Sequence, residues 1–182
     1  MTPFISFYTP TFRRPQQLAA CLASVGAQTV VDDIEQIVIP DHVGLGIGGM
    51  FQRVQEYTSA VHGRYVHLLA DDDVLASPSV VEKVRAFAES RNFPPVIVVK
   101  VEKAGAQLPY GEPWPPRLTA IDLGCVITRS DIWRKHAKCY GDRYEGDFDH
   151  MQSLFEAGHQ AAYLDLLFLR GAVSNGRAEV AA

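Results

Sequence analysis

Residues 64–75 read RYVHLLADDDVL, an apolar run of strand length that ends in three successive carboxylates, Asp71, Asp72 and Asp73. Sheet formation does not require this triplet, because neighbouring like charges repel one another by about 1 kcal/mol even in water. Such carboxylates persist where a cation neutralises them, and hard oxygen ligands suit Mg²⁺ or Mn²⁺. The alternative is a solvated turn that caps the next helix. Because ligands bind at the carboxyl ends of strands in open α/β sheets, the position favours a metal site.

Strand and helix patterns alternate on both sides of the aspartates. Residues 3–9 and 34–40 predict strands, and residues 16–27 between them have apolar side chains at helical spacing, with Pro15 in the first turn. This β-α-β order predicts a parallel sheet. Further strands are expected at residues 95–101, 125–128 and 162–169, and helices at residues 50–60, 78–91, 131–139 and 150–157, with Ser77 and Asp149 as caps. The Pro- and Gly-rich residues 102–119 predict a long loop or a pair of edge strands.

The composition of the 182-residue chain, 47% hydrophobic and 21% charged, predicts a single domain over residues 1–182 with a sizeable core. The formal net charge of -4 argues against a dedicated nucleic-acid-binding protein, which usually has a basic face. The cysteines, Cys21, Cys125 and Cys139, lack metal-type spacing and suit reduced thiols. No apolar run reaches transmembrane length, so we expect a soluble cytoplasmic protein.

A glycine pattern follows the second predicted strand. Gly44, Gly46 and Gly49 have the spacing G-x-G-x-x-G, and the next strand leads into Asp71. This arrangement is the fingerprint of dinucleotide-binding Rossmann folds and raises the alternative of an NAD(P)-binding oxidoreductase. Against that alternative, a β-α unit with its own loop precedes the pattern, and three acids stand where one suffices. A glycine-rich loop also lets other ligands approach the bare backbone.

Three motifs, in this order, resemble those of the family 2 glycosyltransferases, which have the GT-A fold. They are FYTPTFRRP at residues 7–15, LADDDVL at residues 69–75 and EGDFD at residues 145–149, and the resemblance covers most of residues 4–170. It implies a GT-A-like (Rossmann-like) α/β/α sandwich with a mostly parallel central sheet. It also implies inverting transfer of a hexose from a nucleotide diphosphate sugar, most often UDP-linked, to the hydroxyl of a glycan or another acceptor, with Mn²⁺ or Mg²⁺ as cofactor.

The same resemblance implies roles for individual residues. The nucleotide would be bound by Thr9, Pro10 and Thr11 around its pocket, by Asp41 at the nucleobase, and by the candidates Arg13, Arg14 and Arg53 at the diphosphate or base. Either Asp71 and Asp73 share the ion from one face of an extended strand, as in an Asp-x-Asp pair, or Asp71 binds the ribose and Asp72 the ion. Asp147 is the expected base that removes the acceptor proton, with Glu145 and Asp149 in reserve. Trp114 is either a stacking platform for the acceptor or a loop anchor.

The chain departs from the family pattern at three places. The second strand ends in PDH at residues 40–42, which leaves Asp41 as the acidic counterpart of a longer motif. Gly146 holds a position where the family commonly has Glu, and residues 170–175 contain no histidine for the metal. His150, beside the acidic motif, is therefore the histidine candidate for a metal contact. Gly146 and the missing histidine raise a further alternative, a non-catalytic module that binds a nucleotide sugar.

Overall fold

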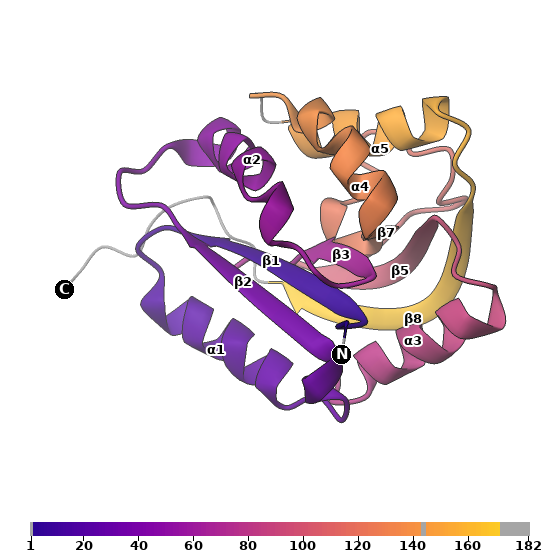
Figure 1. Ribbon diagram of the computed structural model, residues 1–182, viewed down its shortest axis with the longest axis horizontal. Coiled ribbons are helices and arrows are strands. Elements are labelled where there is room, and N and C mark those ends of the chain that lie inside the picture. The colour runs from indigo at the N-terminus through magenta and orange to yellow at the C-terminus, as the bar shows by residue number, and fades with distance from the viewer. Residues whose placement is uncertain (1, 143–144, 172–182) are drawn as a thin grey trace.

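Eight strands form one mixed sheet in the computed structural model, which describes residues 2–142 and 145–171 (Figure 1). The strand order is β2-β1-β3-β7-β5-β8-β4, and β6 pairs with β5 outside this path. The strands are β1 (Ile5–Thr11), β2 (Ile34–Pro40), β3 (Tyr65–Leu68), β4 (Asp73–Leu75), β5 (Val96–Lys103), β6 (Ala106–Leu108), β7 (Val126–Arg129) and β8 (Ala161–Gly171). The α-helices are α1 (Pro15–Gly26), α2 (Gly46–Glu56), α3 (Val80–Ser90), α4 (Ser130–His136) and α5 (Gly146–Glu156).

Most of the strands run in one direction. β1 is parallel to both β2 and β3, β5 is parallel to β8, and the antiparallel β7 joins the two groups. β1, β2, β3, β5 and β8 therefore point the same way, whereas β4, β6 and β7 run opposite. The expected α/β fold with a mostly parallel sheet is confirmed. As a consequence, the carboxyl ends of five strands and the first residue of β4 meet at one edge, where ligands bind in sheets of this kind.

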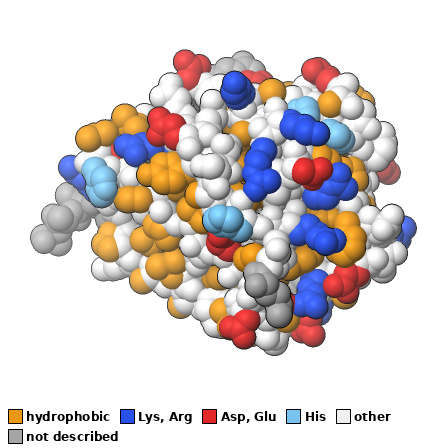
Figure 2. Space-filling model, in the orientation of Figure 1, with side chains coloured by type: hydrophobic (Ala, Val, Ile, Leu, Met, Phe, Trp, Pro, Cys, Tyr) orange, Lys and Arg blue, Asp and Glu red, His pale blue; other side chains and the backbone are white. Residues whose placement is uncertain are grey.

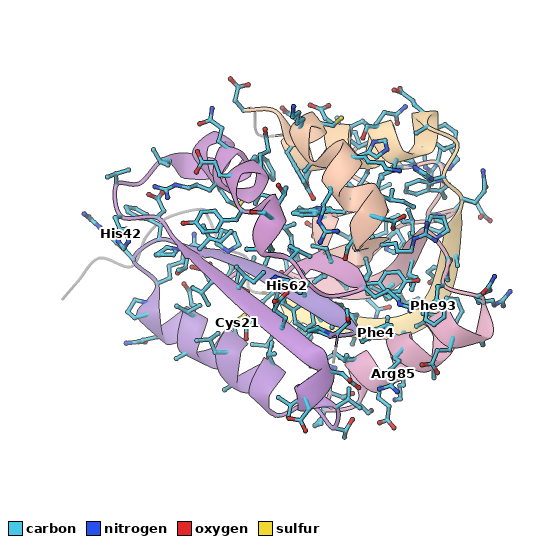
Figure 3. All side chains as sticks on the ribbon, in the orientation of Figure 1. Phe4, Cys21, His42, His62, Arg85 and Phe93 are labelled. Atoms are coloured by element: carbon cyan, nitrogen blue, oxygen red, sulfur yellow. The ribbon has the colours of Figure 1, made fainter. Side chains whose placement is uncertain are left out.

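Helices cover both faces of the sheet. α1 and α3 lie on one face, and α2, α4 and α5 lie on the other (Figure 1). Pro15 is the first residue of α1, as expected, because its fixed φ suits a helix start. On α1 the buried Cys21 points toward the sheet, whereas His42, in the loop after β2, is exposed (Figure 3). None of the helices within the described residues is long and apolar enough to cross a bilayer.

Positive side chains gather over α3 and α4 on the face shown in Figure 2, but carboxylates interrupt the group. Arg85 on α3 pairs with Asp33 and lies 3.2 Å from Glu89. Arg129 donates two hydrogen bonds, of 2.7 and 3.0 Å, to the carboxylate of Asp131. This part of the surface therefore mixes both charges, unlike the continuous basic face that a dedicated nucleic-acid-binding protein presents.

α2 and α3 begin at other residues than the sequence predicts. α2 begins at Gly46 rather than at residue 50, so the glycine-rich segment forms its first turn. α3 begins at Val80 rather than at Pro78, because Ser77 and Pro78 belong to a turn in which the Val80 N–H donates to the Ser77 carbonyl. Ser77 is therefore not the helix cap.

α5 also begins earlier than predicted, at Gly146 rather than at His150. Asp147 and Asp149 consequently lie in its first turn, where the positive end of the helix dipole favours carboxylates. The prediction that Asp149 caps this helix is wrong. The acidic motif is instead the beginning of the helix itself, and this rigid element fixes the backbone of Asp147.

The strand that precedes the aspartates is shorter than predicted. β3 stops at Leu68, and the N–H of Asp73 donates to the carbonyl of Ala70 at 3.0 Å, which closes a turn. Asp73 then begins β4, which pairs with β8 rather than continuing β3. Of the two alternatives for the triplet, the one in which Asp71 and Asp73 share one face of an extended strand is therefore wrong, because a turn separates them.

The proline-rich segment after β5 is a hairpin followed by an anchored loop. β6 pairs antiparallel with β5, so this part of residues 102–119 is a strand at the edge of the sheet, one of the two alternatives that the sequence predicted. Beyond it, Nε1 of the half-buried Trp114 donates to the carbonyl of His159 at 3.0 Å, and its ring meets Phe155 edge-on. These contacts support the role of loop anchor for Trp114.

Candidate active site

A cavity of about 460 Å³ opens at the carboxyl edge of the sheet. The structure brings together ten residues that the sequence singled out, and all of them line this cavity: Pro10, Thr11, Arg14, Asp41, Gly44, Gly46, Asp71, Asp72, Asp73 and Asp147. They come from the ends of β1, β2 and β3, from the loop after β2 and the start of α2, from the start of β4 and from the first turn of α5. Segments far apart in the sequence thus meet in one site, as the strand-end rule predicts.

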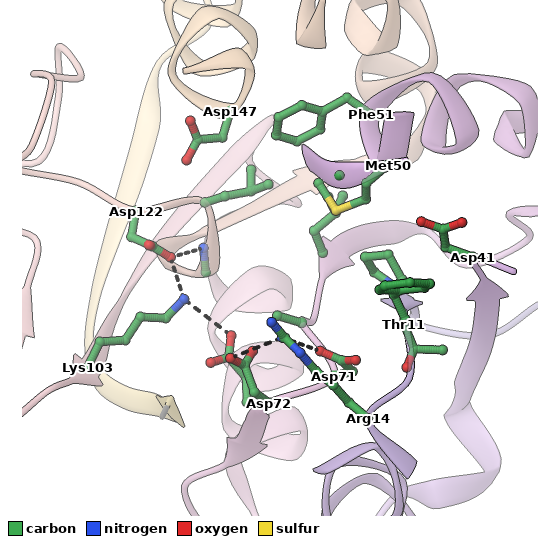
Figure 4. A pocket seen from close by; sticks show the side chains of 18 of the residues that line it. Thr11, Arg14, Asp41, Met50, Phe51, Asp71, Asp72, Lys103, Asp122 and Asp147 are labelled. Atoms are coloured by element: carbon green, nitrogen blue, oxygen red, sulfur yellow. Dashed lines mark hydrogen bonds and ion pairs between the residues drawn. The ribbon is translucent and has the colours of Figure 1, made fainter. Parts of the chain in front are cut away.

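Arg14 neutralises the first two aspartates. Its Nη1 atom lies 3.1 Å from Asp71 Oδ1 and 3.5 Å from Asp72 Oδ2 (Figure 4). The side chains of Arg14, Asp71 and Asp72 are only 13%, 5% and 7% exposed, so water screens this contact weakly. Arg14 directly precedes α1, which fixes the position of its backbone beside the aspartates.

Lys103 neutralises the third aspartate from the other side. Its Nζ atom lies 3.4 Å from Asp73 Oδ2 and 3.1 Å from Asp122 Oδ1. Burial lowers the pKa of Lys103, but the charges and hydrogen bonds of the two carboxylates outweigh this effect and raise it, so the ammonium is charged at neutral pH. Asp122 in turn accepts the N–H of Gly124 at 2.7 Å, which fixes its carboxylate.

Two carboxylate oxygens of the triplet lack partners. Burial raises the pKa of Asp71, although Thr11 and Arg14 oppose the shift, and burial raises the pKa of Asp73 to about 6 against the opposing charge of Lys103. Among the described residues, Asp71 Oδ2 and Asp73 Oδ1 are buried without a hydrogen-bond partner. A divalent cation bound to these oxygens would supply the positive charge and the bonds that they lack.

The described part of the chain holds no group of three or more His, Cys, Asp or Glu side chains placed to share one ion. Arg14 and Lys103 already occupy one oxygen each of Asp71 and Asp73. An ion at this site would therefore take part of its shell from phosphate oxygens and water, as Mg²⁺ commonly does.

Asp147 lines the cavity from the first turn of α5. Burial raises its pKa to about 6, the nearby charge of Asp122 adds to the rise, and the N–H of Phe148, which donates to Oδ1 at 2.7 Å, opposes it. A carboxylate with such a pKa is ionised at neutral pH but still accepts a proton readily, which is the requirement for a general base.

Close packing around the start of α5 explains why residue 146 is a glycine. A Cβ atom at this position would lie 1.8 Å from the carbonyl oxygen of Tyr140 and 2.9 Å from the ring of Phe51. No side chain fits in that space, so close packing requires glycine at this position. The glycine therefore reflects the contact between α5 and its neighbours.

Asp41 holds the loop after β2. Its carboxylate accepts the N–H groups of Val43, Gly44 and Leu45 at 2.9, 2.9 and 2.6 Å. Burial raises the pKa of Asp41, but these three hydrogen bonds lower it by more, so the net shift of the pKa is downward. The side chain lines the cavity and at the same time shapes the loop that leads into α2.

Other residues that the sequence singled out lie outside the residues that line the cavity: Thr9, Arg53, Glu145, Asp149 and His150. Thr9 is buried in the sheet, where its hydroxyl accepts a hydrogen bond from Gln36 at 3.3 Å. His150 is buried against Tyr140, with ring centroids 4.2 Å apart, and its Nδ1 lies 3.1 Å from the His136 carbonyl oxygen. The structure therefore does not bring His150 to the aspartates.

Sequence reasoning missed Lys103 and Asp122. Lys103 ends β5 in the structure, whereas the predicted strand stops at residue 101, so Lys103 fell into the predicted loop and the rule that located the aspartates was not applied to it. Asp122 lies in an irregular segment, and no spacing in the sequence marks it. Two apolar lining residues on α2, Met50 and Phe51, were missed because helical spacing alone does not distinguish a cavity wall from the core.

Comparison with solved structures identifies the fold. Crystal structures of S. aureus TarS 1–349 in complex with UDP-GlcNAc and with UDP match the chain with TM-scores of 0.65 and 0.66. Both are 14% identical in sequence; the matches cover 96% and 93% of this chain and 60% of the TarS chain. A197 from STIV matches with a TM-score of 0.52 and 13% identity, over 88% of this chain and 81% of that one. No family model and no curated protein matches the sequence.

The likeness, at such low identity, establishes the fold. The chain shares the fold of TarS and spans about 60% of the length of TarS 1–349. The expectation of a glycosyltransferase-like α/β fold is confirmed at this level.

Proposed function

We propose that the protein is a glycosyltransferase that moves a hexose from a UDP-sugar to an acceptor hydroxyl. The observation that carries the proposal is the arrangement of the cavity. Arg14 and the three aspartates occupy one end of it, and the separate carboxylate of Asp147 faces it from another element (Figure 4). The shared fold with a protein crystallised with UDP and with UDP-GlcNAc supports the choice of donor.

Asp147 is the proposed base. The acceptor hydroxyl gives its proton to Asp147 while its oxygen attacks the anomeric carbon, and the bond from that carbon to the diphosphate oxygen breaks on the opposite side. The electron pair leaves with the diphosphate, so the anomeric configuration inverts. The pKa of about 6 at Asp147 keeps the carboxylate ionised at neutral pH.

The nucleotide occupies the other end of the cavity in this proposal. Pro10 and Thr11 line its pocket, and Arg14, from its place beside Asp71 and Asp72, contacts the diphosphate. Asp41 contacts the nucleobase from the loop whose N–H groups it already binds. Asp71, Asp72 and Asp73 would hold Mn²⁺ or Mg²⁺, and the ion would stabilise the negative charge on the departing diphosphate.

The proposal is tested by donor hydrolysis, because water can replace the acceptor hydroxyl. Purified protein is incubated with UDP-glucose, UDP-galactose and UDP-GlcNAc in the presence of Mn²⁺, and released UDP is measured. Asp147→Asn keeps the shape of the side chain and removes the base, so we expect hydrolysis to fall by about 10²-fold or more with donor binding retained. Hydrolysis by Asp147→Asn at the wild-type rate would contradict the assignment of the base.

Binding measurements with the same donors and with NADH distinguish two other functions. Donor binding without hydrolysis by wild type or variant would favour a non-catalytic module that binds a nucleotide sugar. Binding of NADH that is tight and indifferent to chelator would favour the dinucleotide-binding alternative suggested by Gly44, Gly46 and Gly49.

A further inference from the structure

Lys103 and Asp122 form an ion pair on the cavity wall that the proposed chemistry does not use. The Lys103 Nζ atom lies 3.1 Å from Asp122 Oδ1, and both side chains are partly exposed to the cavity, at 27% and 28%. Neither residue belongs to the aspartate triplet or to the acidic motif. A partly exposed ion pair contributes little to the stability of the fold. A role in ligand binding would account for the place of this pair at the carboxyl edge of the sheet.

The Lys103–Asp122 pair lies between the aspartate triplet and Asp147 on the wall of the cavity. Figure 4 shows Asp122 and Lys103 on one side, between Asp71 and Asp72 at one end of the cavity and Asp147 at the other. Lys103 also contacts Asp73, and the charge of Asp122 influences Asp147. The pair thus links the end assigned to the diphosphate with the carboxylate assigned as base.

A donor sugar has to lie between these two ends. In an in-line displacement the anomeric carbon stands between the leaving diphosphate oxygen and the acceptor oxygen, and the base contacts the acceptor. The space beside Lys103 and Asp122 is therefore the space for the transferred sugar.

The pair has hydrogen-bonding capacity left for sugar hydroxyls. Lys103 has three N–H donors, and two point to the carboxylates of Asp73 and Asp122. Asp122 receives both Lys103 and the N–H of Gly124 on Oδ1, which leaves Oδ2 without a partner among the described residues. A hydroxyl group can donate to Asp122 Oδ2 and accept from Lys103, and hydrogen bonds to charged groups are the stronger kind.

The charges of this wall discriminate against an acidic sugar. The cavity lining holds two cationic side chains, Arg14 and Lys103, so it stays net negative even with a divalent cation on the aspartate triplet, because it also holds six carboxylates: Asp41, Asp71, Asp72, Asp73, Asp122 and Asp147. A sugar carboxylate placed here meets net repulsion, whereas a neutral sugar does not.

We propose that Lys103 and Asp122 form the sugar subsite and select donors that carry an uncharged hexose over donors that carry a hexuronate. This inference rests on the proposed glycosyltransferase function.

The test uses two donors that differ only at C6 of the sugar, UDP-glucose and UDP-glucuronate, with UDP as reference. Dissociation constants are measured by calorimetry with Mn²⁺ at pH 7.5 for wild type, Asp122→Asn and Lys103→Met. Wild type is expected to prefer UDP-glucose about tenfold or more. Asp122→Asn removes a negative charge and should reduce this preference several-fold, whereas Lys103→Met removes the positive charge and should increase it. Affinity for UDP itself should change less than threefold in Asp122→Asn, whose carboxylate lies outside the triplet, and Lys103→Met is judged by the ratio of its affinities for the two donors.

Two controls keep the outcome interpretable. Lys103→Arg retains the charge and should retain the wild-type preference even if Lys103→Met is unstable. Lys138→Met changes the charge by the same amount at an exposed lysine outside the cavity lining and should have no effect. Equal donor preferences in wild type, Asp122→Asn and Lys103→Met, with UDP binding intact, would overturn the inference. Absence of UDP binding by wild type would instead contradict the proposed function itself.

Discussion

Lys103 Nζ lies 3.4 Å from Asp73 Oδ2, across Gly171. The register of the sheet creates this contact, because Gly171 on β8 pairs with Asp73 on one side and with Lys103 on the other. A Cβ atom at Gly171 would lie 2.3 Å from Asp73 Oδ1 and 2.9 Å from Lys103 Cε. The glycine therefore leaves the space in which the two charged side chains meet.

Gly171→Ala should separate Lys103 from Asp73. The added methyl group overlaps both side chains, so we expect a loss of stability of about 1–3 kcal/mol, seen as a drop of several degrees in Tm. Gly26→Ala is the matched control, since no atom outside its own helix lies within 4 Å of the added methyl group. Equal Tm values for Gly171→Ala and wild type would show that the space at β8 is not needed.

Arg14→Gln should strengthen the binding of Mn²⁺ in the absence of nucleotide. Arg14 pairs with Asp71 and Asp72, so its removal leaves two more negative groups free for a cation. Calorimetry with Mn²⁺ alone should show an affinity several-fold higher than that of wild type, while UDP binding with Mn²⁺ weakens because the diphosphate loses a positive partner. Weaker binding of Mn²⁺ to Arg14→Gln would contradict this account of the ion pair.

Asp147→Asn should stabilise the fold above pH 6. Burial raises the pKa of Asp147 from 3.8 to about 6, so its contribution to stability is fully present below pH 3.8 and is lost as the pH rises through 6. A rise of about two units corresponds to roughly 1–3 kcal/mol once partial exposure is allowed for. We expect a higher Tm for the variant at pH 7.5 and a smaller difference at pH 5. A variant less stable than wild type at pH 7.5 would mean that the charged carboxylate has a stabilising partner.

Donor hydrolysis should follow the ionisation of the same residue. With a pKa of about 6, Asp147 is protonated at pH 5 and cannot accept a proton. The rate at saturating donor should therefore fall about tenfold for each unit below pH 6 and reach a plateau above pH 7. A rate that is constant between pH 5 and 7 would place the base elsewhere.

The sequence predicted the element types and the edge at which the site forms. The residues that follow each strand could be assigned to the site, because parallel strands bring their carboxyl ends together whatever the length of the connection between them. This is why Thr11, Asp41 and Asp71, separated by whole β-α units, meet at one cavity as expected. Helix starts were less predictable, since the helix expected at residues 150–157 begins four residues earlier, at Gly146.

Contacts across the sheet were not predictable from local patterns. The register that places Gly171 between Asp73 and Lys103 is set by packing of whole strands, and a shift of one residue would reverse every side chain. The turn at Asp73 is similarly a consequence of pairing between β4 and β8, a contact between residues distant in sequence. The sequence therefore indicated that Arg14 and the aspartates of the motifs gather, but not that Lys103 and Asp122 lie beside them.

The central claim, that this cavity binds a nucleotide sugar, is tested most directly by calorimetric titration with UDP-GlcNAc and with NADH, each with Mn²⁺ and again after addition of EDTA. We expect UDP-GlcNAc to bind in the micromolar to millimolar range with Mn²⁺ and markedly more weakly with EDTA, because the buried carboxylates repel a diphosphate unless a cation intervenes. NADH that binds more tightly than UDP-GlcNAc, with an affinity unchanged by EDTA, would contradict the account.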